Sequence, residues 1–233
     1  MDNQPSLAKI VGEVLRKGQS EQEKAVALHN FVRDGVLFGF SRNFDAATPE
    51  ETLSCGRGHG IPKSRLLAAL FKTAGFESYL HFVLIPKEIL WDTLPPNLYW
   101  LLPDEISHSY VEVKVSGWWC RIDSFIVDRS LQLAGRARLR IEKRQMGYGV
   151  RLGGTSIWSG RGDAFSQFSE VLMVADHGRV EDPVAFFKDS RYRNKIYGIP
   201  VNTLFRFRGK RNTEKINADM DRFRRLGWVE RVV

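Results

Sequence analysis

Two stretches decide the fold of this chain: GRGHGIPKSRLLAALFKTAGF (56–76) and HSYVEVKVSGWWCRID (108–123). In the first, apolar residues recur at helical spacing between Pro62, which suits the first turn of a helix, and Gly75, which suits its end. The second is rich in β-branched and aromatic residues on both sides of the Ser-Gly pair at 116–117, which is typical of a hairpin turn. The chain is therefore predicted to pack a helix on an antiparallel sheet, an α+β fold.

The hairpin brings a histidine and an aspartate together. Its turn lies roughly midway between His108 and Asp123, so these positions are expected to lie opposite each other on neighbouring strands. A histidine whose second ring nitrogen is held by a carboxylate is a competent general base near neutral pH. The helix start at residues 60–63 offers backbone N–H groups that stabilise negative charge. These features predict a catalytic centre with His108 as the base and Asp123 as its orienting partner.

The same residues resemble the transglutaminase-like superfamily, whose core is a papain-like cysteine-protease fold. The family pattern is a Gly-rich turn and a Cys that open a helix ending in Ala-Gly. A His-x-x-x-Glu-Val strand, a Gly-Trp hairpin and an Asp strand follow. The two quoted stretches match this order, and the resemblance extends over about residues 20–128. It implies N-terminal helices packed on an antiparallel sheet, and a Cys–His–Asp triad in which His108 and Asp123 hold the last two roles.

The sequence departs from the family pattern at the nucleophile. Counting back from the Ala-Gly step at 74–75, the family's Cys falls on Gly60, which has no side chain. Two neighbours are candidates for the gap: Cys55 as a displaced thiol, and His59 as a second acid or base. The alternatives are a small or buried apolar residue for Cys55 and a solvent-facing loop residue for His59. We expect Gly60, His59 and Cys55 to contact the substrate.

The long connection 86–107 is rich in aromatic residues and is predicted to cover the site as a binding loop, with Trp91 as a substrate contact. His81 would join a two-histidine, one-carboxylate iron site only if it faced His108 and Asp123. A core histidine with satisfied hydrogen bonds is the simpler interpretation. We therefore expect neither a metal nor a cofactor.

Further elements flank this core. Helices are predicted over 6–17, 20–34, 181–187 and 213–226, strands over 78–85 and 118–125, and mostly loop over 41–60. Residues 129–146 fit either a basic helix or an irregular return. Because no Pro- or Ser-rich linker divides the chain, residues 1–128 are assigned to the transglutaminase-like core. Residues 129–233 are assigned to a basic C-terminal extension packed on the same domain.

The net charge of +8 is unevenly distributed. Residues 1–128 carry 13 Lys and Arg against 16 Asp and Glu, while residues 129–233 carry 22 against 11. Arginines alternate in the basic part, at 136/138/140, 191/193 and 206/208. On strands they would share a face, and we expect them to turn into the cleft and bind a small anionic substrate. FRFRGKR (205–211) is compatible with nucleic acid, but no helix-turn-helix, RNA-recognition motif or zinc finger accompanies it, so nucleic acid is not expected.

Composition excludes several classes of protein. Hydrophobic residues make up 43% and charged residues 27%, which is typical of a globular protein and not of a disordered tail or a coiled-coil rod. No apolar run reaches the roughly 18 residues of a membrane span, and no apolar signal core follows Met1. With Cys55 and Cys120 alone, neither a disulfide framework nor a cysteine-based zinc site is available. We expect a cytoplasmic protein without membrane association.

Three functions fit the sequence. The first is an enzyme without a catalytic thiol, in which the His108–Asp123 dyad performs acid–base chemistry on a small anionic or acyl/amide metabolite. Cyclisation, isomerisation, hydration and elimination all suit such a dyad. The second is a catalytically inactive binding or scaffold protein with a closed cleft. The third is a thiol-dependent transferase, amidase or protease that uses Cys55.

Overall fold

The computed structural model describes residues 6–208 and 210–229 of the chain. Its centre is a four-stranded sheet in the order β5-β4-β3-β8, and all its pairings are antiparallel. The strands are β3 (Ser78–Pro86), β4 (Glu105–Val115), β5 (Trp118–Ile122) and β8 (Ala175–Val180). The predicted α+β class with an antiparallel sheet is confirmed.

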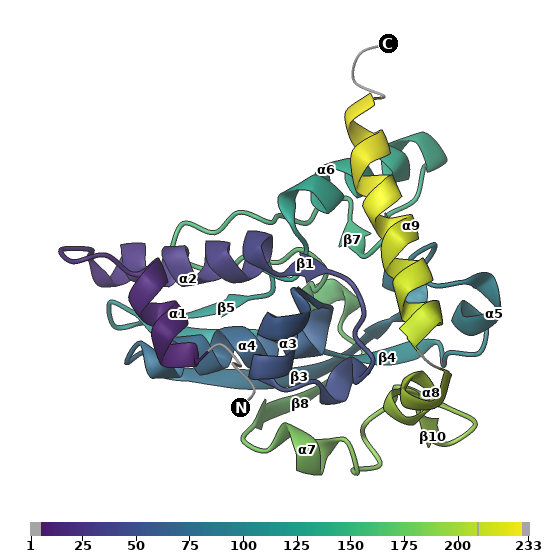
Figure 1. Ribbon diagram of the computed structural model, residues 1–233, viewed down its shortest axis with the longest axis horizontal. Helices are drawn as coiled ribbons and strands as arrows, with labels where there is room; N and C mark the ends of the chain where they lie inside the picture. Colours follow the sequence, from purple (N-terminus) through teal and green to yellow (C-terminus); the bar gives the residue numbers. More distant parts are fainter. Residues whose placement is uncertain (1–5, 209, 230–233) are drawn as a thin grey trace.

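Two helices pack against this sheet (Figure 1). α2 (Glu21–Gly35) begins at the predicted capping box, in which the Glu23 N–H donates to the Ser20 hydroxyl and the Ser20 N–H donates to the Glu23 carboxylate. α4 (Gly60–Thr73) contacts both β3 and β4. Its predicted apolar face is fully buried and consists of Leu66, Leu67, Leu70 and Phe71. The burial of this face fixes the start of α4 against the sheet.

A helix forms where loop was expected, between residues 41 and 60. α3 (Pro49–Cys55) begins at Thr48, whose side chain forms a second capping box with Glu51, and Pro49 occupies its first turn. The expectation of loop was wrong here because the polar composition obscured this start signal. Along the chain, α3 connects two short strands that pair with each other in parallel, β1 (Leu37–Phe38) and β2 (Arg57–Gly58).

Residues after 128 contribute to the same sheet and core. Of the two structures predicted for residues 129–146, a basic helix or an irregular return, the helix is correct: it is α6 (Arg129–Glu142). α9 (Lys210–Val229) packs along α6 (Figure 1). The expected strand-like alternation of arginines was therefore wrong. Arginines 136, 138 and 140 lie on α6, and Arg206 lies on α8 (Val201–Arg208). Residues two apart on a helix do not share a face. The rest of the 205–211 motif has its side chains outside the described part of the chain, from residue 207 onward.

The remaining elements are short, and the first helix ends three residues before the predicted position. They are α1 (Leu7–Val14), η1 (Phe44–Ala46), η2 (Lys87–Leu90), α5 (Pro96–Tyr99), β6 (Met146–Gly147), β7 (Val150–Arg151), η3 (Glu170–Leu172), α7 (Pro183–Phe186), β9 (Lys195–Ile196) and β10 (Ile199–Pro200). Asp182 caps α7 as predicted, accepting from the N–H groups of Val184 and Ala185.

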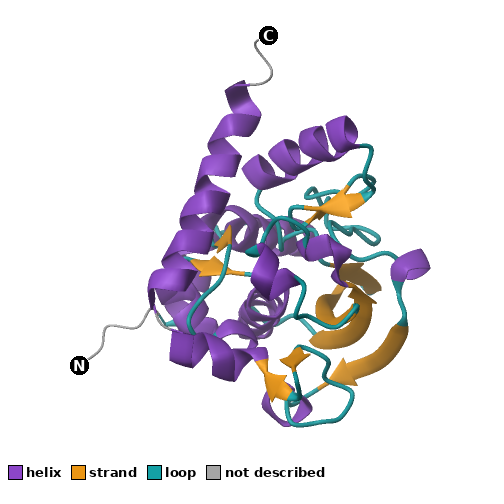
Figure 2. Ribbon diagram, turned by 90° about the vertical axis from the view of Figure 1, so that its right-hand side faces the viewer, coloured by secondary structure: helices purple, strands orange, loops and turns teal. Residues whose placement is uncertain are grey.

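Figure 2 shows the long helices gathered on one side of the molecule and the curved strands on the other. One large cluster of buried apolar side chains joins α2, α4, the sheet and α9, and a smaller cluster lies around Val83, Ile106 and Phe168. Among the helices within the described ranges, none is long and apolar enough to cross a membrane.

Candidate functional site

The site is built around the first residue of α4, Gly60. His59 precedes it as the N-cap residue, and both residues are buried. A Cβ atom built on Gly60 would lie 3.2 Å from Nδ1 and 3.4 Å from Cε1 of His108. The imidazole of His108 therefore faces the space that a side chain at position 60 would enter.

His108 lies on β4 and is held by Asp123, which follows β5. Its Nε2 is 3.1 Å from Asp123 Oδ2, and the two residues are 4% and 0% exposed. Because a carboxylate oxygen only accepts hydrogen bonds, the neutral form of the ring carries its proton on Nε2 and presents the lone pair of Nδ1 toward Gly60. The register pairs Val111 with Ile122, so His108 and Asp123 are diagonal neighbours rather than directly opposite. They still meet because diagonal positions share one face of a sheet.

A loop far along the chain fixes the Asp123 carboxylate. The carboxylate accepts the backbone N–H groups of Ser166, Gln167 and Phe168, the last at 2.7 Å. The Ser166 hydroxyl donates to the Asp123 carbonyl at 2.9 Å. Sequence reasoning missed this loop because most of its donors are backbone N–H groups, which no pattern of side chains predicts. Together these bonds hold Asp123 in one orientation, and Asp123 in turn orients His108.

A second histidine–carboxylate pair lies beside the first. His59 Nε2 is 2.7 Å from Asp45 Oδ1, while Asp45 Oδ2 accepts from the Tyr192 hydroxyl at 2.6 Å and the Asn194 side-chain amide at 2.7 Å. Burial, and then the charge of Asp45, raise the pKa of Tyr192, so its hydroxyl keeps the proton that it donates. His59 Nδ1 is buried and has no hydrogen-bond partner among the described residues. The sequence pointed to His59 but not to its partner Asp45, nor to Tyr192 and Asn194, which donate to Asp45.

His59, Gly60 and His108 line one cavity of about 40 Å³. A buried water needs about 10–15 Å³ of such space, whereas small-molecule pockets span about 300–1,000 Å³. The cavity therefore admits water but no metabolite. The side chains that close it are mostly apolar and include Phe38, Phe40, Phe44, Leu90, Leu102, Ile106 and Val201. No arginine or lysine is among the described lining residues, so the expectation that arginines turn into this cleft was wrong.

The sequence profile of the transglutaminase-like superfamily matches residues 8–124, the range that contains α4, His108 and Asp123. The chain belongs to the transglutaminase-like superfamily. No curated protein and no solved structure matches it significantly.

In this transglutaminase-like protein, fewer backbone donors are available at the helix start than expected. Pro62 has no N–H group, and the Lys63 N–H donates to the His59 carbonyl at 3.1 Å. Within the described structure, this leaves the N–H groups of Gly60 and Ile61 as the donors at the positive end of the α4 dipole.

Two expected contacts of the transglutaminase-like site lie elsewhere. Cys55 is the last residue of α3 and is exposed. Trp91 packs against Tyr99 with ring centroids 5.3 Å apart, and the Arg144 guanidinium lies 4.4 Å from its ring. Neither Cys55 nor Trp91 is among the described residues that line the cavity. Part of the aromatic content of the 86–107 connection thus packs within the connection itself instead of facing His108.

His81 has both ring nitrogens paired. Nδ1 is 3.2 Å from Glu112 and Nε2 is 2.5 Å from Asp176, and the ring stacks on Tyr110. Burial alone would lower the pKa of His81, but the two carboxylates raise it above its ordinary value. His81 is not among the residues that line the cavity. No group of three or more His, Cys, Asp or Glu within residues 6–208 and 210–229 is arranged to hold a metal ion.

Proposed function

We propose that this transglutaminase-like protein is a cofactor-independent enzyme that adds water to the acyl or amide carbonyl of a small molecule. His108 is the general base, Asp123 orients it, and water takes the place that the family pattern gives to a thiol. The two free amides at the start of α4 stabilise negative charge on the substrate oxygen. A carbonyl is a better reacting group than an anion here because the described lining of the cavity has no cationic side chain.

The proposed reaction has two steps. His108 Nδ1 takes a proton from water while the water oxygen attacks the carbonyl carbon, and the carbonyl electron pair moves to the substrate oxygen. The bond from carbon to the leaving nitrogen, sulfur or oxygen then breaks, the carbonyl re-forms, and Nδ1–H returns its proton to the leaving group. Asp123 stabilises the transient imidazolium through Nε2–H. The products are a carboxylic acid and an amine, thiol or alcohol, and no redox change occurs.

One observation carries this proposal: the Nδ1 lone pair of His108 faces the space left by Gly60, in a cavity of the size of water. His59 lines the same cavity, and its Nδ1 is buried without a hydrogen-bond partner among the described residues, which makes it a second candidate acceptor for a water there. A buried acceptor without any partner costs about 1–3 kcal/mol. A water between the two histidines removes this cost at His59 and places an O–H group within reach of the base.

A second function, a non-catalytic binding protein, is favoured by the closure of the same cavity. Under this hypothesis the His108–Asp123 pair stabilises the β4–β5 hairpin, and no substrate reaches it. The third hypothesis, a thiol enzyme, is disfavoured by the exposed position of Cys55 outside the cavity. We also propose that the protein is cytoplasmic, because a chain with only two cysteines does not depend on a framework of disulfides.

The experiment is a turnover assay on a chromogenic panel. The panel contains 4-nitrophenyl esters and 4-nitroanilides of acids from acetate to dodecanoate, assayed with the full chain and with His108→Ala. The matched control is His177→Ala, because His177 lies on β8 and is not among the residues that line the cavity. Removal of a general base lowers kcat by about 10²–10⁴-fold.

We expect this loss in His108→Ala and an unchanged rate in His177→Ala. Equal rates in both variants would show that turnover does not depend on His108 and would overturn the proposal. Absence of turnover over the whole panel, combined with an unchanged melting temperature in His108→Ala, would favour the binding protein instead.

A further inference from the structure

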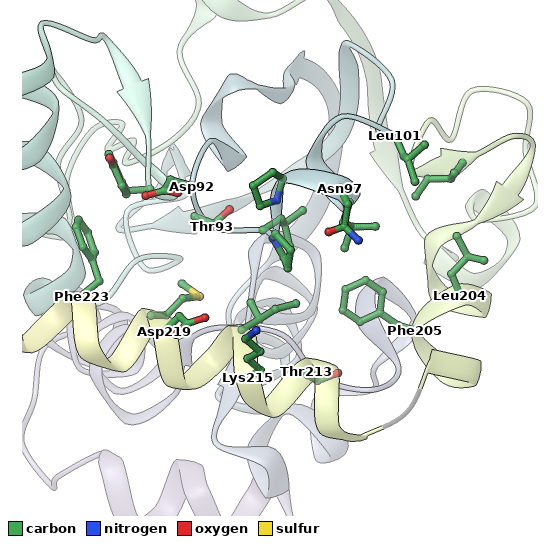
Figure 3. A pocket seen from close by; sticks show the side chains of 18 of the residues that line it. Asp92, Thr93, Asn97, Leu101, Leu204, Phe205, Thr213, Lys215, Asp219 and Phe223 are labelled. Atoms are coloured by element: carbon green, nitrogen blue, oxygen red, sulfur yellow. The ribbon is translucent and has the colours of Figure 1, made fainter.

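A large apolar chamber lies beside the small cavity. Its volume is about 830 Å³, and its walls come from the 86–107 connection, the β9–β10 hairpin, α8 and α9 (Figure 3). The walls are lined chiefly by apolar side chains, among them Leu94, Leu98, Leu204, Phe205, Ile216 and Met220. This volume lies within the range of about 300–1,000 Å³ that small-molecule sites occupy, and mostly apolar walls are typical of such sites.

The charges on the chamber indicate an uncharged occupant. Asp92 and Asp219 are balanced by Lys215 and Arg222, and all four residues are exposed. No single sign of charge therefore dominates the chamber. An apolar chain without a charged end is the chemistry that these walls favour.

The same elements line both the chamber and the small cavity. On α8, Val201 faces the cavity, while Leu204 and Phe205 face the chamber three and four residues later, on the same side of the helix. In the 86–107 connection, Leu102 lines the cavity and its neighbour Leu101 lines the chamber. The two spaces are therefore adjacent.

Stacked on Phe40, whose ring lies 5.1 Å from His59 and 6.2 Å from Phe205, Phe44 stands between the cavity and the chamber. Its ring centroid is 4.3 Å from that of His59 and 4.7 Å from that of Phe205, which lines the chamber. Phe44 has a backbone φ of 47°, a left-handed conformation that is a genuine outlier for a bulky residue. Strained backbone of this kind clusters at ligand clamps and switch regions. Phe44 also immediately precedes Asp45, the partner of His59.

We infer that the chamber binds the unbranched apolar chain of an acyl substrate and that Phe44 is the partition through which its carbonyl reaches His59 and His108. The inference rests on the proposed function for the reaction at His108, but the binding itself does not depend on it. A chain held in the chamber would have its uncharged ester or amide end directed at the small cavity.

Binding is measured without turnover. N-phenyl-1-naphthylamine, an uncharged fluorophore that brightens in apolar sites, is displaced from the full chain by primary alkyl amides of four to twelve carbons. The chamber is narrowed by Leu204→Trp on α8 or, independently, by Leu98→Trp on α5. Ala218→Trp is the matched control, because Ala218 is exposed on α9 and lies outside the chamber lining.

We expect displacement to tighten with chain length and to weaken about tenfold or more in both narrowed variants, which corresponds to about 1.4 kcal/mol. Ala218→Trp should bind like the unmodified chain. If probe binding is equal in all variants, or independent of chain length, the inference is overturned. A concentration-dependent dimer that Leu204→Trp abolishes would also overturn it, because a second copy would then cover the chamber.

The two proposals fail in different ways. If long amides bind but no ester is hydrolysed, the chamber stands and the proposed function falls. If short esters are hydrolysed through His108 but KM does not fall with chain length, the proposed function stands and the chamber is not its substrate site.

Discussion

Asp123→Asn is the substitution that tests the geometry of the site most sharply. The carboxylate accepts backbone N–H groups on both oxygens, from Ser166 on Oδ1 and from Phe168 on Oδ2, and His108 Nε2–H on Oδ2 as well. An asparagine has one oxygen and one NH₂ group. In one orientation of the amide the NH₂ group faces the Ser166 N–H, and in the other it faces the Phe168 N–H. One backbone donor therefore always faces another donor.

The expected cost follows from this count. One buried backbone donor loses its acceptor, at about 1–3 kcal/mol, and the bonds that persist change from charged to neutral ones, at about 1 kcal/mol each. The free energy of unfolding should therefore fall by about 2–5 kcal/mol. For a chain of this length, this lowers the melting temperature on the order of 10 °C.

The assay is urea denaturation followed by circular dichroism, with Asp163→Asn as the control. Asp163 lies three residues before Ser166 in the sequence and pairs with Arg121 at 2.6 Å, but the pair is partly exposed. Exposed ion pairs contribute about 0–1 kcal/mol, so the control should lose little stability. Equal losses for the two variants, or a loss below about 0.5 kcal/mol for Asp123→Asn, would refute the bonding described for Asp123.

Three further predictions concern nearby residues. Gly60→Ala places a methyl group 3.2 Å from His108 Nδ1, where the proposed water would lie. It should lower kcat roughly 100-fold and leave the circular dichroism spectrum unchanged. Full activity of this variant would show that no water is needed there. Burial lowers the pKa of His29 to about 3, so the unfolded chain binds a proton that the folded chain excludes. The free energy of unfolding should thus fall between pH 6.5 and 3 in urea titrations, and His29→Gln should flatten this fall. Burial also lowers the pKa of Lys63 from 10.5 to about 7, so the free energy of unfolding should rise with pH over that interval; a flat profile would contradict this environment of Lys63.

The central motif of the fold could be predicted because its signals are local. The apolar spacing of α4, the turn at 116–117 and the Ser20 capping box each act within a few residues. They suffice to place His108 and Asp123 on adjacent strands. The two-residue register offset between them was not predicted, because the spacing of the pair around the turn does not fix the exact pairing.

The rest of the site depends on contacts between distant parts of the chain. Asp45 meets Tyr192 and Asn194 across almost 150 positions, and no local pattern encodes such a contact. The Ser166–Phe168 loop binds the Asp123 carboxylate chiefly through its backbone N–H groups, and of its side chains the Ser166 hydroxyl also donates to Asp123. Trp91 was misplaced because aromatic residues in a long connection pack on one another as readily as on a ligand.

The central claim is that catalysis belongs to His108 and not to a thiol. The most direct test is the initial rate of 4-nitrophenyl decanoate hydrolysis after treatment with iodoacetamide, which alkylates the exposed Cys55 and leaves the buried Cys120 covered. We expect the treated full chain to keep its rate and the treated His108→Ala variant to lose it. Loss of activity on alkylation, or persistence of activity in His108→Ala, would contradict it.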